Sequence, residues 1–206
     1  MKIVLIATSN AGKLRDFAGA AAIHQIGVQA LPDFESLPSV VEDGTTFEAN
    51  ACKKAEHYSR YTPGELVLTD DSGLEVDALN GAPGVYSARY AAMGSNPQNA
   101  HDAANNARLL RELASQSDRN ARFVCVVALA RDGKTLATFR GVAAGEILHE
   151  ARGTQGFGYD PLFYFPALKK TFAELSAEEK AKVSHRGQAF RKFLSWYELE
   201  STASNE

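Results

Sequence analysis

The sequence predicts an α/β protein. Short apolar runs at 2–8, 66–68 and 123–130 are typical of buried strands. Segments in which apolar residues recur at helical spacing lie between them, at 14–27 and 45–61. Alternation of these two patterns along one chain favours a sheet covered by helices.

The composition is that of an ordinary globular protein. With 206 residues the chain can bury a substantial core as one domain, or as one domain with two lobes. Hydrophobic residues make up 45% and charged residues 23% of it. The net charge of −3 offers no overall basic surface, so we expect no nucleic-acid partner. A small anionic ligand is compatible with this charge where basic residues cluster locally.

The two cysteines, Cys52 and Cys125, form neither a disulfide framework nor a zinc pattern, and both are expected in the core. No apolar run has the length of a membrane span, and the N-terminus lacks the layout of a signal peptide. We therefore expect a cytoplasmic protein with no membrane partner.

The loop after the first strand has the features of a phosphate site. Ser9 to Lys13 joins the strand at 2–8 to the helix expected at 14–27. Free backbone N–H groups, the helix dipole and a lysine all favour an anion there. It is not a Walker A loop, because Leu14 stands where that motif has Ser or Thr. The alternative is an ordinary strand–helix turn with a surface lysine.

A second strand is expected at 28–31, followed by a proline-containing loop that carries Glu42. Thr45 and Glu48 predict a capping box for a helix that ends near Tyr61. At 100° per residue its buried face comprises four residues, Phe47, Ala51, Ala55 and Tyr58. Lys54 falls on the flank of that face, on the side of Asn50, whereas Lys53 points away. Lys54 is the better candidate for a ligand contact.

Two carboxylates follow the run at 66–68. The strand is expected to stop at Thr69, so that Asp70-Asp71-Ser72-Gly73 forms a turn. Ionised carboxylates are rarely buried without a partner or a metal. At the end of a strand they would lie where open α/β sheets place their ligands. The turn is therefore either a simple solvated bend or part of a ligand or metal site.

Further along, the alternation at 85–90 predicts a strand and the periodicity at 99–116 a packed helix. The strand at 123–130, the turn signal Asp132-Gly133 and a return at 135–148 predict a hairpin.

The segment 153–161 is rich in glycine around Phe157. Such a ring is poorly covered by its neighbours and suits stacking on a flat ligand, with Asp160 available to read an edge. The alternative is that Phe157 fills the core. A strand is expected to resume at 162–165.

Two helices are expected at the end of the chain. Ser176 and Glu179 predict a capping box for a short helix at 176–182. His185 and Arg186 stand at the N-terminus of the last helix, where the dipole disfavours a cation unless an anion or acceptor meets it. That placement favours a functional role for these two residues over the alternative that they are solvated surface residues.

Together these residues have the chemistry of a site for a nucleoside triphosphate with magnesium. Lys13 and Lys54 suit phosphates, and Phe157 suits a base. Glu42 and Asp71 suit a hard cation, because Mg²⁺ is commonly held by one or two carboxylates together with substrate phosphates.

Five ordered motifs lie at 8–13 (TSNAGK), 42–55 (EDGTTFEANACKKA), 69–90 (TDDSGLEVDALNGAPGVYSARY), 156–163 (GFGYDPLF) and 176–189 (SAEEKAKVSHRGQA). Over nearly the whole chain they resemble the inosine triphosphate pyrophosphatase family. The resemblance implies hydrolysis of ITP, dITP and XTP to the nucleoside monophosphate and pyrophosphate, with Mg²⁺ as cofactor and water attacking the α-phosphorus.

The resemblance also implies roles for individual residues. Asp71 would be the catalytic base and, with Glu42, a magnesium ligand. Asp70, in contrast, would support the turn. The implied substrate-binding residues are Thr8, Ser9, Asn10, Ala11, Gly12, Lys13, Lys54, Ser72, Phe157, Gly158, Tyr159, Asp160, Lys180, His185 and Arg186.

The fold implied by the resemblance is α/β, a mixed sheet flanked by helices, with two lobes around a central substrate cleft. We expect a single two-lobed domain over 1–200, a polar tail at 201–206 and a homodimer. Two other functions stay open: a Maf-type pyrophosphatase acting on dTTP and UTP, and a nucleotide-binding module without catalysis.

Overall fold

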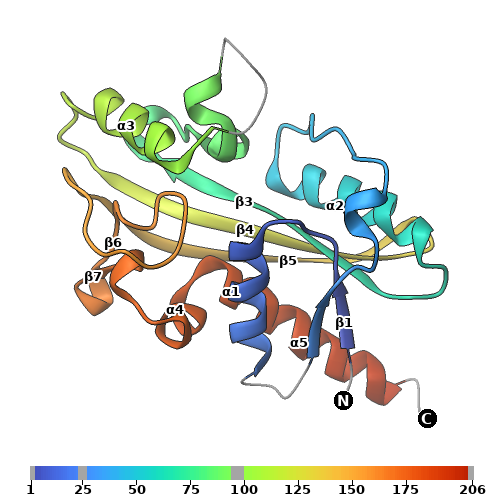
Figure 1. The fold of residues 1–206 in the computed structure, drawn as a ribbon. Helices are drawn as coiled ribbons and strands as arrows, with labels where there is room; N and C mark the ends of the chain where they lie inside the picture. Colours follow the sequence, from blue (N-terminus) through green and yellow to red (C-terminus); the bar gives the residue numbers. More distant parts are fainter. Residues whose placement is uncertain (1–2, 23–26, 94–99, 204–206) are drawn as a thin grey trace.

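A computed structural model describes residues 3–22, 27–93 and 100–203 (Figure 1). Within these residues seven strands form one sheet in the order β2-β1-β3-β4-β5-β6-β7. The strands are β1 Ile3–Ile6, β2 Gly27–Ala30, β3 Val67–Val76, β4 Asn120–Arg131, β5 Lys134–Ile147, β6 Phe163–Phe165 and β7 Lys170–Thr171. The α-helices are α1 Ala11–Ala22, α2 Phe47–Tyr58, α3 Asp102–Glu112, α4 Ala177–Val183 and α5 His185–Ala203.

The sheet is mixed, as predicted. β1 runs parallel to β2 and β3, whereas each of the successive pairs from β3–β4 to β6–β7 is antiparallel. Helices cover both faces of its long strands, with α2 on one side and α1 and α5 on the other (Figure 1). Side chains of β4 alternate between these layers: Cys125 and Val127 pack with α1 and α5, whereas Val124 and Val126 pack with α2.

The neighbours β1 and β3 differ in length, and this difference shapes the site. β1 pairs with β3 only at Leu5 and Ile6, opposite Val67 and Leu68. Beyond Leu68, β3 continues to Val76 with β4 on its other side. The chain leaves β1 into the loop at 8–10 at the point where this edge of β3 loses its partner. A cleft beside the middle of β3 follows from that geometry.

The predicted turn at Asp70 to Gly73 is wrong. All four residues lie inside β3 and pair with Val124 to Val127 of β4. Charge alone suggested an end to the strand, because isolated carboxylates are costly to bury. The strand continues because cations from neighbouring helices neutralise both carboxylates. The alternative that these residues form a solvated bend is therefore excluded.

The predicted strand at 85–90 is also wrong, since Gly84–Ala92 forms a 3-10 segment called η4. Ser87 stabilises it by donating to the Gly84 carbonyl while accepting from the Leu74 amide. These bonds give the segment local partners that a period-2 pattern does not reveal.

Several helices begin, end or are capped at residues other than those predicted. The α2 N-cap is Thr46, whose hydroxyl accepts from the Ala49 amide, rather than Thr45. The helix expected at 99–116 is α3, which is shorter at both ends and spans only Asp102–Glu112, with residue 99 outside the described part. α5 reaches Ala203, so the segment expected as a tail from 201 begins as helix, and 204–206 are outside the described residues. Residues 23–26 also lie outside the described part, and Gly27, near which the first helix was expected to end, is the first residue of β2.

Other local predictions are confirmed. Ser176 and Glu179 form the capping box of α4. Asp132 and Gly133 both have positive φ, at 51° and 77°, as a tight hairpin turn between β4 and β5 requires. Cys125 is buried, while Cys52 is only partly so, and both are free thiols. None of the described helices is long and apolar enough to cross a membrane.

Candidate active site

A cleft of about 720 Å³ opens at the free edge of β3. It collects side chains from the loop after β1, the loop before α2, β3 itself, the segment after β5 and the helices α1, α2, α4 and α5. Nearly all of the predicted site residues line it: Thr8, Ser9, Asn10, Lys13, Glu42, Lys54, Asp71, Ser72, Phe157, Gly158, Tyr159, Asp160, Lys180, His185 and Arg186. Ala11 and Gly12 are not among its lining residues and form the first turn of α1 behind it.

Asp70 and Asp71 are adjacent in sequence but face opposite sides of the sheet. Directly opposed residues of an antiparallel pair share a face, and successive residues alternate. Asp70 is opposite Val127, on the α1 and α5 side, and Asp71 is opposite Val126, on the α2 side. The two carboxylates therefore meet different cations.

Asp70 is 2% exposed and lies among positive charges. Its Oδ2 is 3.0 Å from the Lys13 Nζ and 3.5 Å from the Arg186 Nη2, and it accepts from the Ser72 hydroxyl. Burial opposes ionisation, but the charges of Lys13 and Arg186 outweigh it and hold the pKa of Asp70 well below its usual range. Asp70 is thus a buried counter-ion, not the support of a turn.

This pairing predicts a pH-dependent stability difference between wild type and Asp70→Asn. A depressed pKa stabilises the folded state above the unfolded pKa of about 4, and that contribution is lost as the pH falls through the folded pKa. The variant, which leaves two buried cations without this partner, should be less stable by about 3–5 kcal/mol at pH 7. Urea unfolding from pH 7 to pH 2 should show that the difference in free energy of unfolding between wild type and variant becomes smaller below about pH 4. A gap that stays constant over this range would contradict the assignment.

Asp71 is held by α2. Its Oδ2 accepts from the Asn50 side-chain amide at 3.0 Å, and its Oδ1 is 3.8 Å from the Lys54 Nζ. Burial raises the pKa of Asp71 above its usual value, although the nearby charges of Lys54 and Lys13 act in the opposite direction. A carboxylate with a raised pKa at a cleft is suited to proton transfer.

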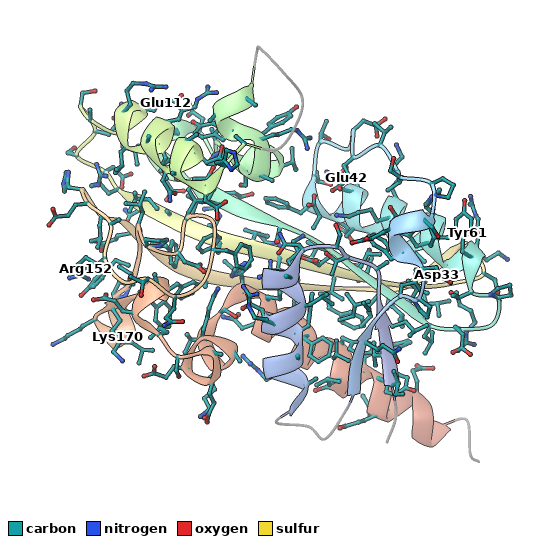
Figure 2. All side chains as sticks on the ribbon, in the orientation of Figure 1. Asp33, Glu42, Tyr61, Glu112, Arg152 and Lys170 are labelled. Carbon is teal, nitrogen blue, oxygen red and sulfur yellow. The ribbon has the colours of Figure 1, made fainter. Side chains whose placement is uncertain are left out.

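Glu42 and Asp71 converge on one point of the cleft. Glu42 lies on the loop before α2 (Figure 2), and its Oε2 is 2.8 Å from the same Lys54 Nζ that Asp71 approaches. Oxygen ligands of this type suit a hard divalent cation. Among the described residues no group of three His, Cys, Asp or Glu side chains could hold a metal. The pair therefore fits a cation whose remaining ligands are substrate oxygens and water.

The predicted phosphate loop is organised by its own side chains. The Asn10 side-chain oxygen accepts from the Lys13 amide at 3.0 Å and so caps α1. The Thr8 hydroxyl accepts from the Asn10 amide. Lys13 projects from the first turn of this helix into the cleft, where it meets Asp70. The sequence alternative of a surface lysine is excluded, because this lysine is mostly buried.

Phe157 is half-buried, and its ring lies against the start of α1: a Cβ on Gly12 would come within 2.5 Å of it. The Lys180 Nζ and the Arg186 guanidinium lie 5.0 and 5.6 Å from the ring centre. The ring therefore faces the cleft beside two cations and is not a core residue. Its amide donates to Asp160.

Asp160 and Tyr159 have partners within the protein. The Asp160 carboxylate accepts from the Lys180 ammonium at 2.7 Å, and burial raises its pKa. The Tyr159 hydroxyl donates to the Ser87 carbonyl. These two side chains hold the segment around Phe157 in place, so the prediction that Asp160 is free to read a base edge is not matched by its geometry.

His185 and Arg186 begin α5, as predicted. His185 is buried with its ring stacked on Phe123, and burial together with the neighbouring Arg186 charge lowers its pKa well below the usual value. Arg186 is 2% exposed and donates to Asp16 and Ser72. The anion expected to meet a cation at this terminus is supplied by the protein itself.

Sequence reasoning missed three residues of the cleft region. Asp16, one turn after Lys13 on α1, binds Arg186 and lies 3.4 Å from Lys180. Asn50, one turn before Lys54, orients Asp71 and accepts from the Gly44 amide. Arg89 lies in η4 and lines the cleft. Helical spacing to Lys13 and Lys54 could have found the first two.

The fold and the cleft define an α/β protein with a ligand site at the free edge of a mixed sheet, where lysines face paired carboxylates. The chain belongs to the Ham1 family, whose model matches residues 4–196.

Relatives and solved structures agree with this membership. The chain is 50% identical over 193 residues to the dITP/XTP pyrophosphatase of Acidobacterium capsulatum, covering 92% of this chain and 95% of that protein. It is 49% identical to the enzyme of the same name from Desulfotalea psychrophila, covering 91% and 81%. The Staphylococcus aureus Ham1 protein superposes with a TM-score of 0.80 at 42% identity, covering 97% and 100% of the two chains.

Proposed function

We propose that this chain hydrolyses the non-standard purine nucleoside triphosphates ITP, dITP and XTP to the nucleoside monophosphate and pyrophosphate, in a reaction that depends on Mg²⁺. The names of its relatives, dITP/XTP pyrophosphatase, support this substrate class. The single observation that carries the proposal is the convergence of Glu42, Lys54 and Asp71 at one point of the cleft.

The chemistry of the cleft residues supports one reaction path. Lys13 and the backbone of the loop at 8–13 bind and orient the phosphates. Asp71 accepts a proton from a water molecule whose oxygen attacks the α-phosphorus. The bond between the α-phosphorus and the bridging oxygen breaks, and pyrophosphate leaves with that oxygen. Most of the catalysis is positioning and charge neutralisation, as in other phosphoryl transfers.

Glu42 and Asp71 would hold the magnesium ion. When bound, the ion neutralises phosphate charge and polarises the P–O bonds. Lys54, which lies 2.8 Å from Glu42 and 3.8 Å from Asp71, is placed to bind a phosphate oxygen beside these carboxylates.

The other end of the cleft would bind the base. Phe157 offers a ring face for stacking, Lys180 and Arg186 lie beside that ring, and His185 lines the same cleft. Donors at the base 6-position would bond to an oxo group but would leave an amino group, itself a donor, without an acceptor, so we expect ATP to be a poor substrate. A single two-lobed domain over 1–200, a homodimer and a cytoplasmic location complete the proposal.

Product analysis tests this function. With ITP and Mg²⁺ the enzyme should release one pyrophosphate per IMP and no orthophosphate, and a chelator in excess of Mg²⁺ should abolish turnover. In a panel of triphosphates ITP, dITP and XTP should exceed ATP, dTTP and UTP in kcat/KM. Preference for dTTP and UTP would favour a Maf-type activity. Binding without turnover would favour a non-catalytic module.

A further inference from the structure

Arg89 differs from the other cations of the cleft in its charge balance. Each of the other lysines and arginines that line the cleft has a carboxylate partner within 3.0 Å. These pairs are Lys13–Asp70, Lys54–Glu42, Lys180–Asp160 and Arg186–Asp16. Arg89 lines the same cleft but pairs with no carboxylate in the described part of the chain. Among the residues that the structure describes, its guanidinium donates only to the Glu42 carbonyl, at 3.3 Å, and it lies 5.2 Å from the centre of the Tyr86 ring.

The position of Arg89 associates it with the carboxylate end of the cleft. The residue whose carbonyl it binds, Glu42, is also the residue whose carboxylate binds Lys54. No described contact joins Arg89 to the separate group formed by Phe157, Lys180 and Arg186. The positive charge of Arg89 therefore adds to the region where a metal-bound phosphate chain would lie.

The chemistry of the guanidinium fits such a ligand. Arginine presents a planar set of N–H donors that matches two phosphate oxygens at once, and it stays charged at all physiological pH values. With a single long bond to a carbonyl, most of the donors of Arg89 have no protein partner among the described residues. Stacking on Tyr86 limits the rotation of the side chain without using those donors.

We propose that Arg89 binds the pyrophosphate portion of the substrate, as a positioning residue at the metal end of the cleft. This inference rests on the proposed function and adds a residue to it. Arg89 holds the distal phosphates while the α-phosphorus is attacked, and it remains bound to pyrophosphate after cleavage. The monophosphate product, which lacks those phosphates, makes no use of it.

Binding of inorganic pyrophosphate tests this role directly. In calorimetry with saturating Mg²⁺, Arg89→Gln should bind pyrophosphate about tenfold more weakly than wild type, because a charge-assisted hydrogen bond is lost. Its affinity for IMP should stay within about twofold. Arg89→Lys, which keeps the charge but not the planar donors, should lie between the two. Arg111→Gln makes the same charge change at an exposed position of α3 and should match wild type.

Two results would overturn the inference: unchanged pyrophosphate affinity in Arg89→Gln, or an equal loss for pyrophosphate and IMP, which would indicate a general distortion of the cleft. Failure of the proposed function would look different. The wild-type protein would then release no pyrophosphate from ITP, whatever the binding data for Arg89.

Discussion

Replacing Asp71 with asparagine should lower kcat for ITP by about 10²–10⁴-fold, the range expected when a general base is lost. Asparagine has nearly the same shape and can still accept from Asn50 through its side-chain oxygen. It cannot take a proton from water, and it is a weaker ligand for a hard cation. Initial rates with ITP over a range of Mg²⁺ concentrations measure the change and separate a lost base from weakened metal binding.

The thermal stability of this variant should not fall. Because burial raises the pKa of Asp71, the ionised carboxylate is disfavoured in the folded protein, and its removal relieves that cost. Lys54 keeps Glu42 as a partner. Asp77→Asn is the matched control, since Asp77 follows β3, is half-exposed and pairs with Arg122 outside the cleft. A rate near wild type in Asp71→Asn, with Asp77→Asn also active, would remove Asp71 from the mechanism.

Replacing Arg186 with methionine should destabilise the protein by about 3–5 kcal/mol, the cost of removing one partner of a buried ion pair. Arg186 is 2% exposed, and its loss leaves Asp16 and Asp70 with less compensation for their charge. For a chain of this size the melting temperature should fall by about 10 °C. Differential scanning calorimetry or urea unfolding at pH 7 measures the effect.

The control for this variant is Arg140→Met, an exposed arginine on β5, which should change stability by no more than about 0.5 kcal/mol. A double variant, Arg186→Met with Asp70→Asn, should be less destabilised than the sum of the two single variants, because the Asp70 carboxylate that Arg186→Met leaves without this cation is absent from it. Strict additivity would show that Asp70 and Arg186 do not interact. Below its melting temperature, Arg186→Met should also discriminate less between ITP and ATP.

Local patterns in the sequence were sufficient for most elements and for part of the site. Helical spacing placed Lys54, and not Lys53, beside the buried face of α2, and the structure confirms it: Lys54 enters the cleft, whereas Lys53 pairs with Asp43 at the surface. The loop before α1 and the N-terminus of α5 were found in the same way. These features depend on the periodicity of one element and on the residues that flank it.

The patterns failed where distant elements supply the partner. The acidic pair was expected to end a strand, yet β3 continues through it, because Lys13 and Arg186 reach Asp70 from one face while Asn50 and Lys54 reach Asp71 from the other. The segment at 85–90 alternates like a strand but is fixed as a 3-10 turn by Ser87.

The sequence by itself determined the alternation of strands and helices, the placement of cations beside phosphate-type loops and the motifs of the family. Only the tertiary structure decided which charges meet. Asp16 and Arg186 are separated by 170 positions and still form a 2.7 Å ion pair, which no local period encodes. The physical reason is that periodicity specifies the faces of a single element, whereas ion pairing and burial depend on where elements cross.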